Sequence, residues 1–145
     1  MRRREFITLL SGVAVGWPLA ARAERPPYLV GMIGNSADWH LFREAMRDLG
    51  YSEGQNVKYE LRTDETEPAR LAEAAKELAS IPVGVIVAYG TPATQAAQAA
   101  TQTIPIVMVQ VGDPVRAGLV ASLAHPGGNV TGSSSSISRP PRRLA

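Results

Sequence analysis

The sequence predicts an α/β fold in which a doubly wound parallel sheet carries helices on both faces. Apolar runs of strand length alternate with helical stripes, and the connections between them are short. Two of those runs have no polar face, which is typical of parallel strands buried on both sides. The strand ends carry glycine and small polar residues, which allow the chain to turn sharply.

The first half of the chain supplies two predicted strand–helix pairs. Residues 28–34 form an apolar run after two prolines and predict a buried strand. Residues 39–49 carry an apolar stripe at helical spacing and end before a glycine. Residues 57–62 alternate between apolar and charged side chains, which predicts an edge strand, and residues 67–80 repeat the helical stripe.

The second half repeats the alternation. Residues 83–88 and 106–111 are rich in β-branched residues and predict two central strands, with an alanine-rich helix between them. Asp113 followed by proline predicts another helix, ending near Leu123. Residues 129–131 predict the start of a fifth strand.

The N-terminal segment, residues 1–23, has the organisation of a signal peptide. A basic start precedes an apolar stretch over residues 6–19, and an Ala-Arg-Ala sequence predicts cleavage after Ala23. The apolar stretch is shorter than the ~20 residues that a spanning helix needs. Arg3 and Arg4 resemble a twin-arginine export signal, so we expect a periplasmic protein. An ordinary Sec signal or the basic N-terminus of a cytoplasmic protein is the alternative.

Composition fits one globular domain, because 45% of the 145 residues are hydrophobic and 19% are charged. Residues 1–23 hold four of the 15 basic residues and one of the 13 acidic ones, which leaves 11 basic against 12 acidic residues. This near-neutral balance argues against a nucleic-acid partner. The chain has no cysteine, which excludes disulfides, thiolate metal sites and a cysteine nucleophile.

Three loops that follow predicted strands are the candidate ligand-binding residues. They are Asn35 and Ser36 after the first strand, Gly90, Thr91 and Pro92 after the third, and Gly112 and Asp113 after the fourth. In a parallel sheet these loops share one edge, where helix N-termini offer free N–H groups to a small polar or anionic ligand. The alternative is purely structural, with Thr91 and Asp113 as helix caps and Pro92 as a first helical residue.

Other chemistry has little support in the sequence. Glycine-rich phosphate motifs and the Gly-x-Ser-x-Gly nucleophile motif are absent, so we expect no nucleotide cofactor and no enzyme. His40 and His125 lie far apart in sequence and lack cysteine partners, so we expect no metal site.

Several motifs together carry a resemblance to a known family. The segments RRREFITLL, PLAARA, LGYSEGQNVKYE and GTPATQAAQAATQTIPIVMVQVGDPVRAGLVASLAHPGGNVTG occur in this order within residues 1–132. They resemble the N-terminal lobe of the bacterial ABC transporter substrate-binding protein family, some of whose members are related to tryptophan- and tyrosine-binding proteins.

The resemblance implies one lobe of a periplasmic-binding-protein-like fold over residues 24–132. Members of the family are exported two-lobe proteins that close around a small solute and deliver it to a membrane permease. It therefore implies an extracytoplasmic, non-enzymatic component of an ABC-type importer that binds an amino-acid-like solute. The candidate loop residues would line the cleft wall, with Thr91 the first choice to receive a ligand carboxylate.

The chain departs from the family after its first lobe. The family has a second lobe, whereas residues 133–145 contain a serine run followed by prolines and arginines, which predicts a disordered tail and a truncated protein. A flavodoxin-like or receiver-like single-lobe domain is the alternative function. The export signal and the lack of an acidic pair after the first strand count against it. A hydrolase fragment is a further alternative, without a histidine near Ser36, Thr91 or Asp113.

Overall fold

The computed structural model describes residues 27–35, 37–62 and 67–135. The predicted signal peptide, Ser36 and most of the predicted tail lie outside these ranges. The strands are β1 (Tyr28–Ile33), β2 (Val57–Arg62), β3 (Val85–Tyr89), β4 (Ile106–Val111) and β5 (Val130–Ser134), and the helices are α1 (Trp39–Asp48), α2 (Pro68–Ser80) and α3 (Thr91–Ala100).

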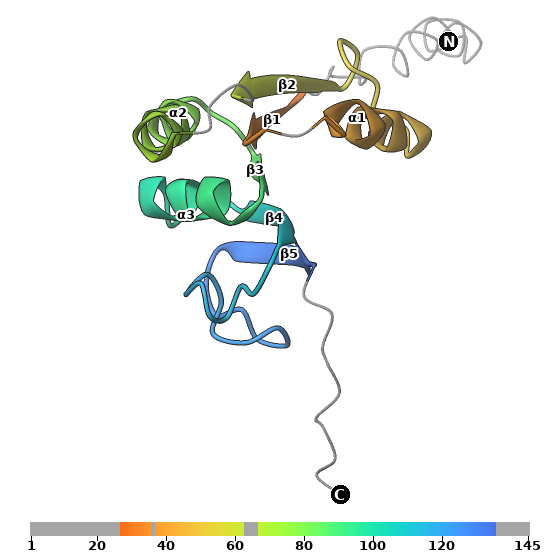
Figure 1. The fold of residues 1–145 in the computed structure, drawn as a ribbon. Coiled ribbons are helices and arrows are strands. Elements are labelled where there is room, and N and C mark those ends of the chain that lie inside the picture. Colours follow the sequence, from red (N-terminus) through yellow and green to blue (C-terminus); the bar gives the residue numbers. More distant parts are fainter. Residues whose placement is uncertain (1–26, 36, 63–66, 136–145) are drawn as a thin grey trace, which may run out of the picture.

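All five strands run parallel, in the order β2-β1-β3-β4-β5. Helix α1 covers one face of the sheet, and α2 and α3 pack together on the other (Figure 1). This arrangement confirms the predicted doubly wound α/β fold. The alternating strand 57–62 forms the edge strand β2, as its pattern predicts.

The larger core lies between the sheet and the pair α2 and α3. Leu78 and Ile86 are fully buried there, and each contributes roughly 1.5–3 kcal/mol by leaving water. Gly31 of β1 makes room for Leu78, because a Cβ at position 31 would lie 3.3 Å from a Leu78 methyl carbon. The small side chains of Ala93 and Ala97 let α3 approach the sheet closely.

An aromatic core lies on the α1 face. Trp39 and Phe42 of α1 pack edge to face with ring centroids 6.1 Å apart. Tyr89 contacts Trp39 at 5.9 Å, and Tyr59 contacts Phe42 at 6.3 Å. These pairs fix α1 across β1, β2 and β3.

The predicted helix from Asp113 to Leu123 is wrong. The N–H groups of Ala117 and Leu119 donate to the carbonyls of Asp113 and Pro114 at 2.9 Å, which amounts to a single turn. Gly118 then takes a φ of 73°, a left-handed conformation that ends helical winding. The chain continues without helix or strand to β5, and Leu119 is buried against the larger core.

Strand β5 extends beyond the predicted lobe boundary at residue 132. Ser133 and Ser134, which were predicted to lie in the disordered tail, belong to the strand. The Ser135 N–H donates to the Val111 carbonyl at 2.8 Å. Pairing with β4 therefore overrides the loop-like composition of the serine run.

Candidate functional site

The carboxyl ends of the strands meet at one edge of the sheet. The Gly34 N–H donates to the Arg62 carbonyl at 3.1 Å, which ties the end of β1 to that of β2. The Gly90 N–H donates to the Val109 carbonyl at 2.8 Å, which ties the end of β3 to β4. The structure thus brings the three candidate loops to the same side of the molecule.

The loop after β1 is held against the start of α3. Gly34 has a φ of 101°, and a Cβ there would lie 2.6 Å from the Tyr89 carbonyl oxygen and 2.9 Å from the Ala93 Cβ. The Trp39 indole N–H donates to the Gly34 carbonyl at 3.0 Å. Asn35, the next residue, is exposed at this edge.

The junction between β3 and α3 differs from its prediction in one respect. Gly90, not Thr91, is the N-cap residue, and Thr91 is the first residue of α3. Gly90 has a φ of 82°, which glycine adopts without the steric cost that a Cβ would bring. The Thr91 side chain is half-buried and makes no hydrogen bond within the described part of the chain. Its hydroxyl and the first N–H groups of α3 are thus not used by capping.

Pro92 and the loop after β4 complete the edge. Pro92 is exposed in the first turn of α3, where its missing N–H costs no helical hydrogen bond. Gly112 and Asp113 are both exposed. The Asp113 Oδ1 atom accepts the Arg116 N–H at 2.9 Å, so the carboxylate caps a single turn and not the helix that was predicted. The Asp113 carboxylate carries a negative charge at this edge of the sheet. The N-terminus of α3 contributes a partial positive charge at the same edge.

Sequence reasoning missed three residues beside these loops. The Tyr89 hydroxyl donates to the Gln110 Oε1 atom at 2.7 Å, and Trp39 packs against the Tyr89 ring. Gln110 has a φ of 53°, a positive value that no other described non-glycine residue takes. The β4–β5 register shifts between Met108 and Val111, which accompanies this turn of the backbone. From the sequence, Trp39 and Tyr89 could be predicted only as core residues. The positive φ of Gln110 has no local sequence signal.

Two features are absent from residues 27–35, 37–62 and 67–135. No group of three or more histidine, cysteine, aspartate or glutamate side chains is placed to hold a metal ion. None of the helices in these ranges combines the length and apolar character needed to cross a bilayer.

The fold and its strand-end edge define one lobe of a periplasmic-binding-protein-like protein. The family model described as "ABC transporter substrate binding protein" matches residues 35–139, and the chain belongs to this family.

Known relatives agree with this assignment. The chain is 42% identical over 97 residues to a "Tyrosine-binding protein" of Clostridioides difficile (strain R20291). The ligand-free, open structure of a Clostridium difficile substrate-binding protein with adhesive properties matches 76% of the chain with a TM-score of 0.72 and 32% identity. An ABC domain in complex with L-Trp from Streptococcus pneumonia matches 74% of it with a TM-score of 0.66 and 31% identity.

The chain spans only part of these proteins. The match covers 67% of this chain but 28% of the tyrosine-binding protein. The structural matches cover 39% of the Clostridium difficile protein and 38% of the Streptococcus pneumonia protein.

Proposed function

We propose that this lobe forms one wall of the solute cleft in an extracytoplasmic component of an ABC-type importer. The proposed solute is amino-acid-like. Family membership supports the binding role, and the names of the relatives, which refer to tyrosine and L-Trp, support the solute class. The role is binding and delivery to a membrane permease, without catalysis.

The observation that carries the proposal is the free N-terminus of α3 at the strand-end edge. The Thr91 hydroxyl and the first N–H groups of α3 would receive the solute carboxylate, since a helix N-terminus favours an anion. The exposed carboxylate of Asp113 would attract the solute ammonium group. The two groups together suit a zwitterion.

The other predicted loop residues have supporting roles in this proposal. Gly90 and Gly112 lack side chains and so let a solute approach the backbone closely. Asn35, Ser36 and Pro92 would line the wall on either side of Thr91, with Ser36 assigned from its sequence position alone. The half-buried Tyr89 would present part of its ring to the solute.

A chimera tests the role of Thr91. Residues 24–135 would replace the matching lobe of the Clostridioides difficile tyrosine-binding protein, and calorimetry would measure binding of L-tyrosine. We expect Thr91→Val to weaken binding at least about tenfold, because a hydrogen bond to a charged group is lost. Thr103→Val, in the exposed loop before β4, is the matched control and should bind normally. Equal affinities for both variants would remove Thr91 from the site.

Export is the second part of the proposal. We infer that residues 1–23 direct the chain to the periplasm by the twin-arginine route and are cleaved after Ala23. Fused to a reporter, the segment should lose export when Arg3 and Arg4 are both replaced by lysine. Unchanged export of that double variant would reject the twin-arginine route.

A further inference from the structure

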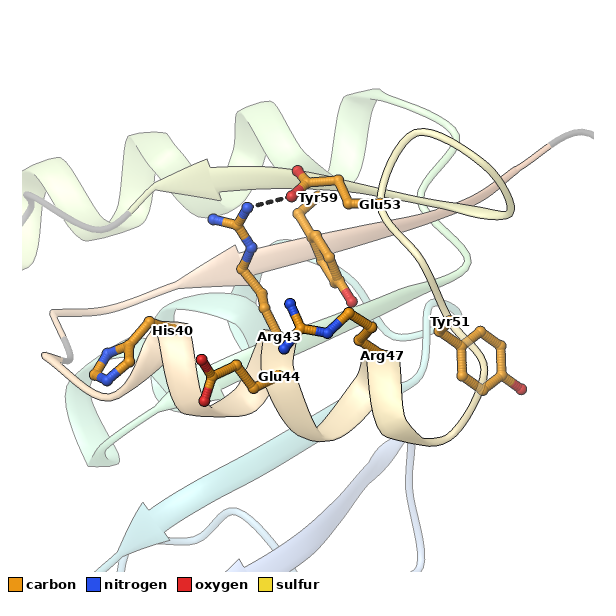
Figure 2. Close-up of a pocket in the computed structure, with 7 residues that line it drawn as sticks. All are labelled: His40, Arg43, Glu44, Arg47, Tyr51, Glu53 and Tyr59. Atoms are coloured by element: carbon orange, nitrogen blue, oxygen red, sulfur yellow. Dashed lines mark hydrogen bonds and ion pairs between the residues drawn. The ribbon is translucent and has the colours of Figure 1, made fainter.

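A second polar groove lies away from the strand-end edge, between α1 and the segment that leads into β2. Its volume is about 290 Å³. Arg43, Arg47, Glu53 and Tyr59 line its centre, and His40 and Tyr51 lie toward its two ends (Figure 2). None of these residues belongs to the proposed solute wall.

Tyr59 places a hydrogen-bond donor in this groove. The residue is 9% exposed, and its hydroxyl oxygen is buried without a hydrogen-bond partner in the part of the chain that the structure describes. Burial chiefly, with a contribution from the charge of Glu53, raises the pKa of Tyr59, so the hydroxyl keeps its proton. A buried hydroxyl without a partner is costly and is expected to find one in another molecule or in water.

The charged residues around Tyr59 differ in whether they form ion pairs. Arg43 forms an ion pair with Glu53, and its guanidinium lies over the Tyr59 ring, 5.6 Å from the centroid. Arg47 makes no ion pair within the described ranges. Figure 2 shows the Tyr59 hydroxyl directed toward the Arg47 side chain, while the Glu44 carboxylate points away from it. Arg47 and Glu44 are thus the two charged lining residues on α1 that make no ion pair among the described residues, and Arg47 is the one on the side of the hydroxyl.

We propose that this groove binds a carboxylate between the guanidinium of Arg47 and the hydroxyl of Tyr59. Arginine matches a carboxylate with two parallel N–H donors, and the tyrosine hydroxyl supplies a third donor from the opposite wall. Arg47 is exposed and long, so its guanidinium can change rotamer to meet a carboxylate without movement of the backbone. A free organic acid and an acidic side chain of a partner protein offer the same group.

The test follows the amide NMR signals of the full chain during titration with sodium acetate, at an ionic strength held constant with sodium chloride. We expect saturable shifts at residues 43–59 that weaken about fivefold to tenfold in both Arg47→Gln and Tyr59→Phe. Arg116→Gln, which removes the same charge from an exposed turn, should titrate like the wild type. Retained dispersion of the other signals shows that each variant is folded.

A blocked tetraglutamate peptide, titrated in parallel, distinguishes the two sources of the carboxylate. Peptide binding tighter than acetate binding assigns the groove to an acidic protein segment, and binding of equal strength per carboxylate assigns it to a free acid. Both results support the site. Shifts that do not saturate, or that persist unchanged in Arg47→Gln and Tyr59→Phe, would overturn it.

Discussion

Two junctions at the strand-end edge have nearly the same sequence but different structures. Gly90-Thr91-Pro92 opens the ten-residue helix α3, whereas Gly112-Asp113-Pro114 opens a single turn. The residues that follow account for the difference. Alanine and glutamine continue α3, while Gly118 takes a left-handed conformation and stops the second turn. A helix-start motif therefore specifies a beginning and not a length.

The junctions also differ in how they use their polar residue. Asp113 hydrogen-bonds the Arg116 N–H, as a cap should, while Thr91 lies inside its helix and Gly90 takes the cap position. Only the first junction thus combines a helix N-terminus with a hydroxyl that capping leaves free. This contrast supports Thr91 as the carboxylate contact.

The largest expected effect is at Gly34, which holds the β1 loop against the first junction. Gly34→Ala should lower the free energy of unfolding by about 3 kcal/mol or more, because left-handed strain adds to a clash with the Tyr89 carbonyl and Ala93. Gly54→Ala, at a φ of 82° with open space around it, should cost only about 1 kcal/mol, the strain alone. Urea denaturation measures both. Equal losses would mean that the close approach at Gly34 contributes nothing.

The glycines of the two junctions form the next pair. Gly90→Ala should cost about 1–2 kcal/mol, since the φ of 82° combined with a ψ of 166° lies in a backbone region that is essentially restricted to glycine. Gly112→Ala should change stability by less than about 0.5 kcal/mol, because its φ is not left-handed and a Cβ would meet nothing within 4 Å. Thermal unfolding compares them. A larger loss at Gly112 would contradict the contrast between the junctions.

The polar residues of the two junctions, Asp113 and Thr91, should differ by a smaller amount of stability. Asp113→Ala should cost about 1 kcal/mol, because the Arg116 N–H loses its partner. Thr91→Ala should cost less than about 0.5 kcal/mol, because no capping hydrogen bond is lost. Chemical denaturation of both variants checks this, and a loss at Thr91 equal to that at Asp113 would indicate a capping role that the structure does not give it.

The smallest effect lies far from both junctions, at Tyr59. Burial raises its pKa above the ordinary value of 10.0, so the folded state holds the proton more tightly than the unfolded chain. The stability that this gives is fully present below pH 10 and is lost as the pH rises through the folded-state pKa. Tyr59→Phe should therefore lose less stability above pH 10 than the wild type does. Parallel alkaline titrations of the unfolding free energy would show the difference, and identical slopes would refute it.

Much of the fold follows from local pattern. The β-branched runs at β3 and β4 predict buried strands, and the alternation in β2 predicts an edge. Because parallel strands place their carboxyl ends together, the position of the three loops could also be predicted. The single turn after Asp113 could not be predicted, since the left-handed Gly118 leads directly into Leu119, which is buried against core residues distant in sequence.

The finer features of the site depend on tertiary contacts. The positive φ of Gln110 accompanies a register shift against β5, and its side chain meets Tyr89 from the neighbouring strand. The sequence alternation places Tyr59 in the core, but it gives no indication that its hydroxyl lacks a partner among the described residues. Both features arise between segments that are separated along the chain, and local propensity does not report them.

The most direct test of the proposed solute wall is an NMR titration of the full chain with L-tryptophan and, separately, with L-tryptophanamide, which lacks the carboxylate. One wall of a cleft should bind weakly, so the position of the shifts matters more than the affinity. The account predicts that L-tryptophan shifts the amide signals of Thr91, Ala93 and Thr94 at the start of α3, and that tryptophanamide leaves them almost unchanged. Equal shifts with both compounds, or shifts confined to the opposite edge of the sheet, would contradict it.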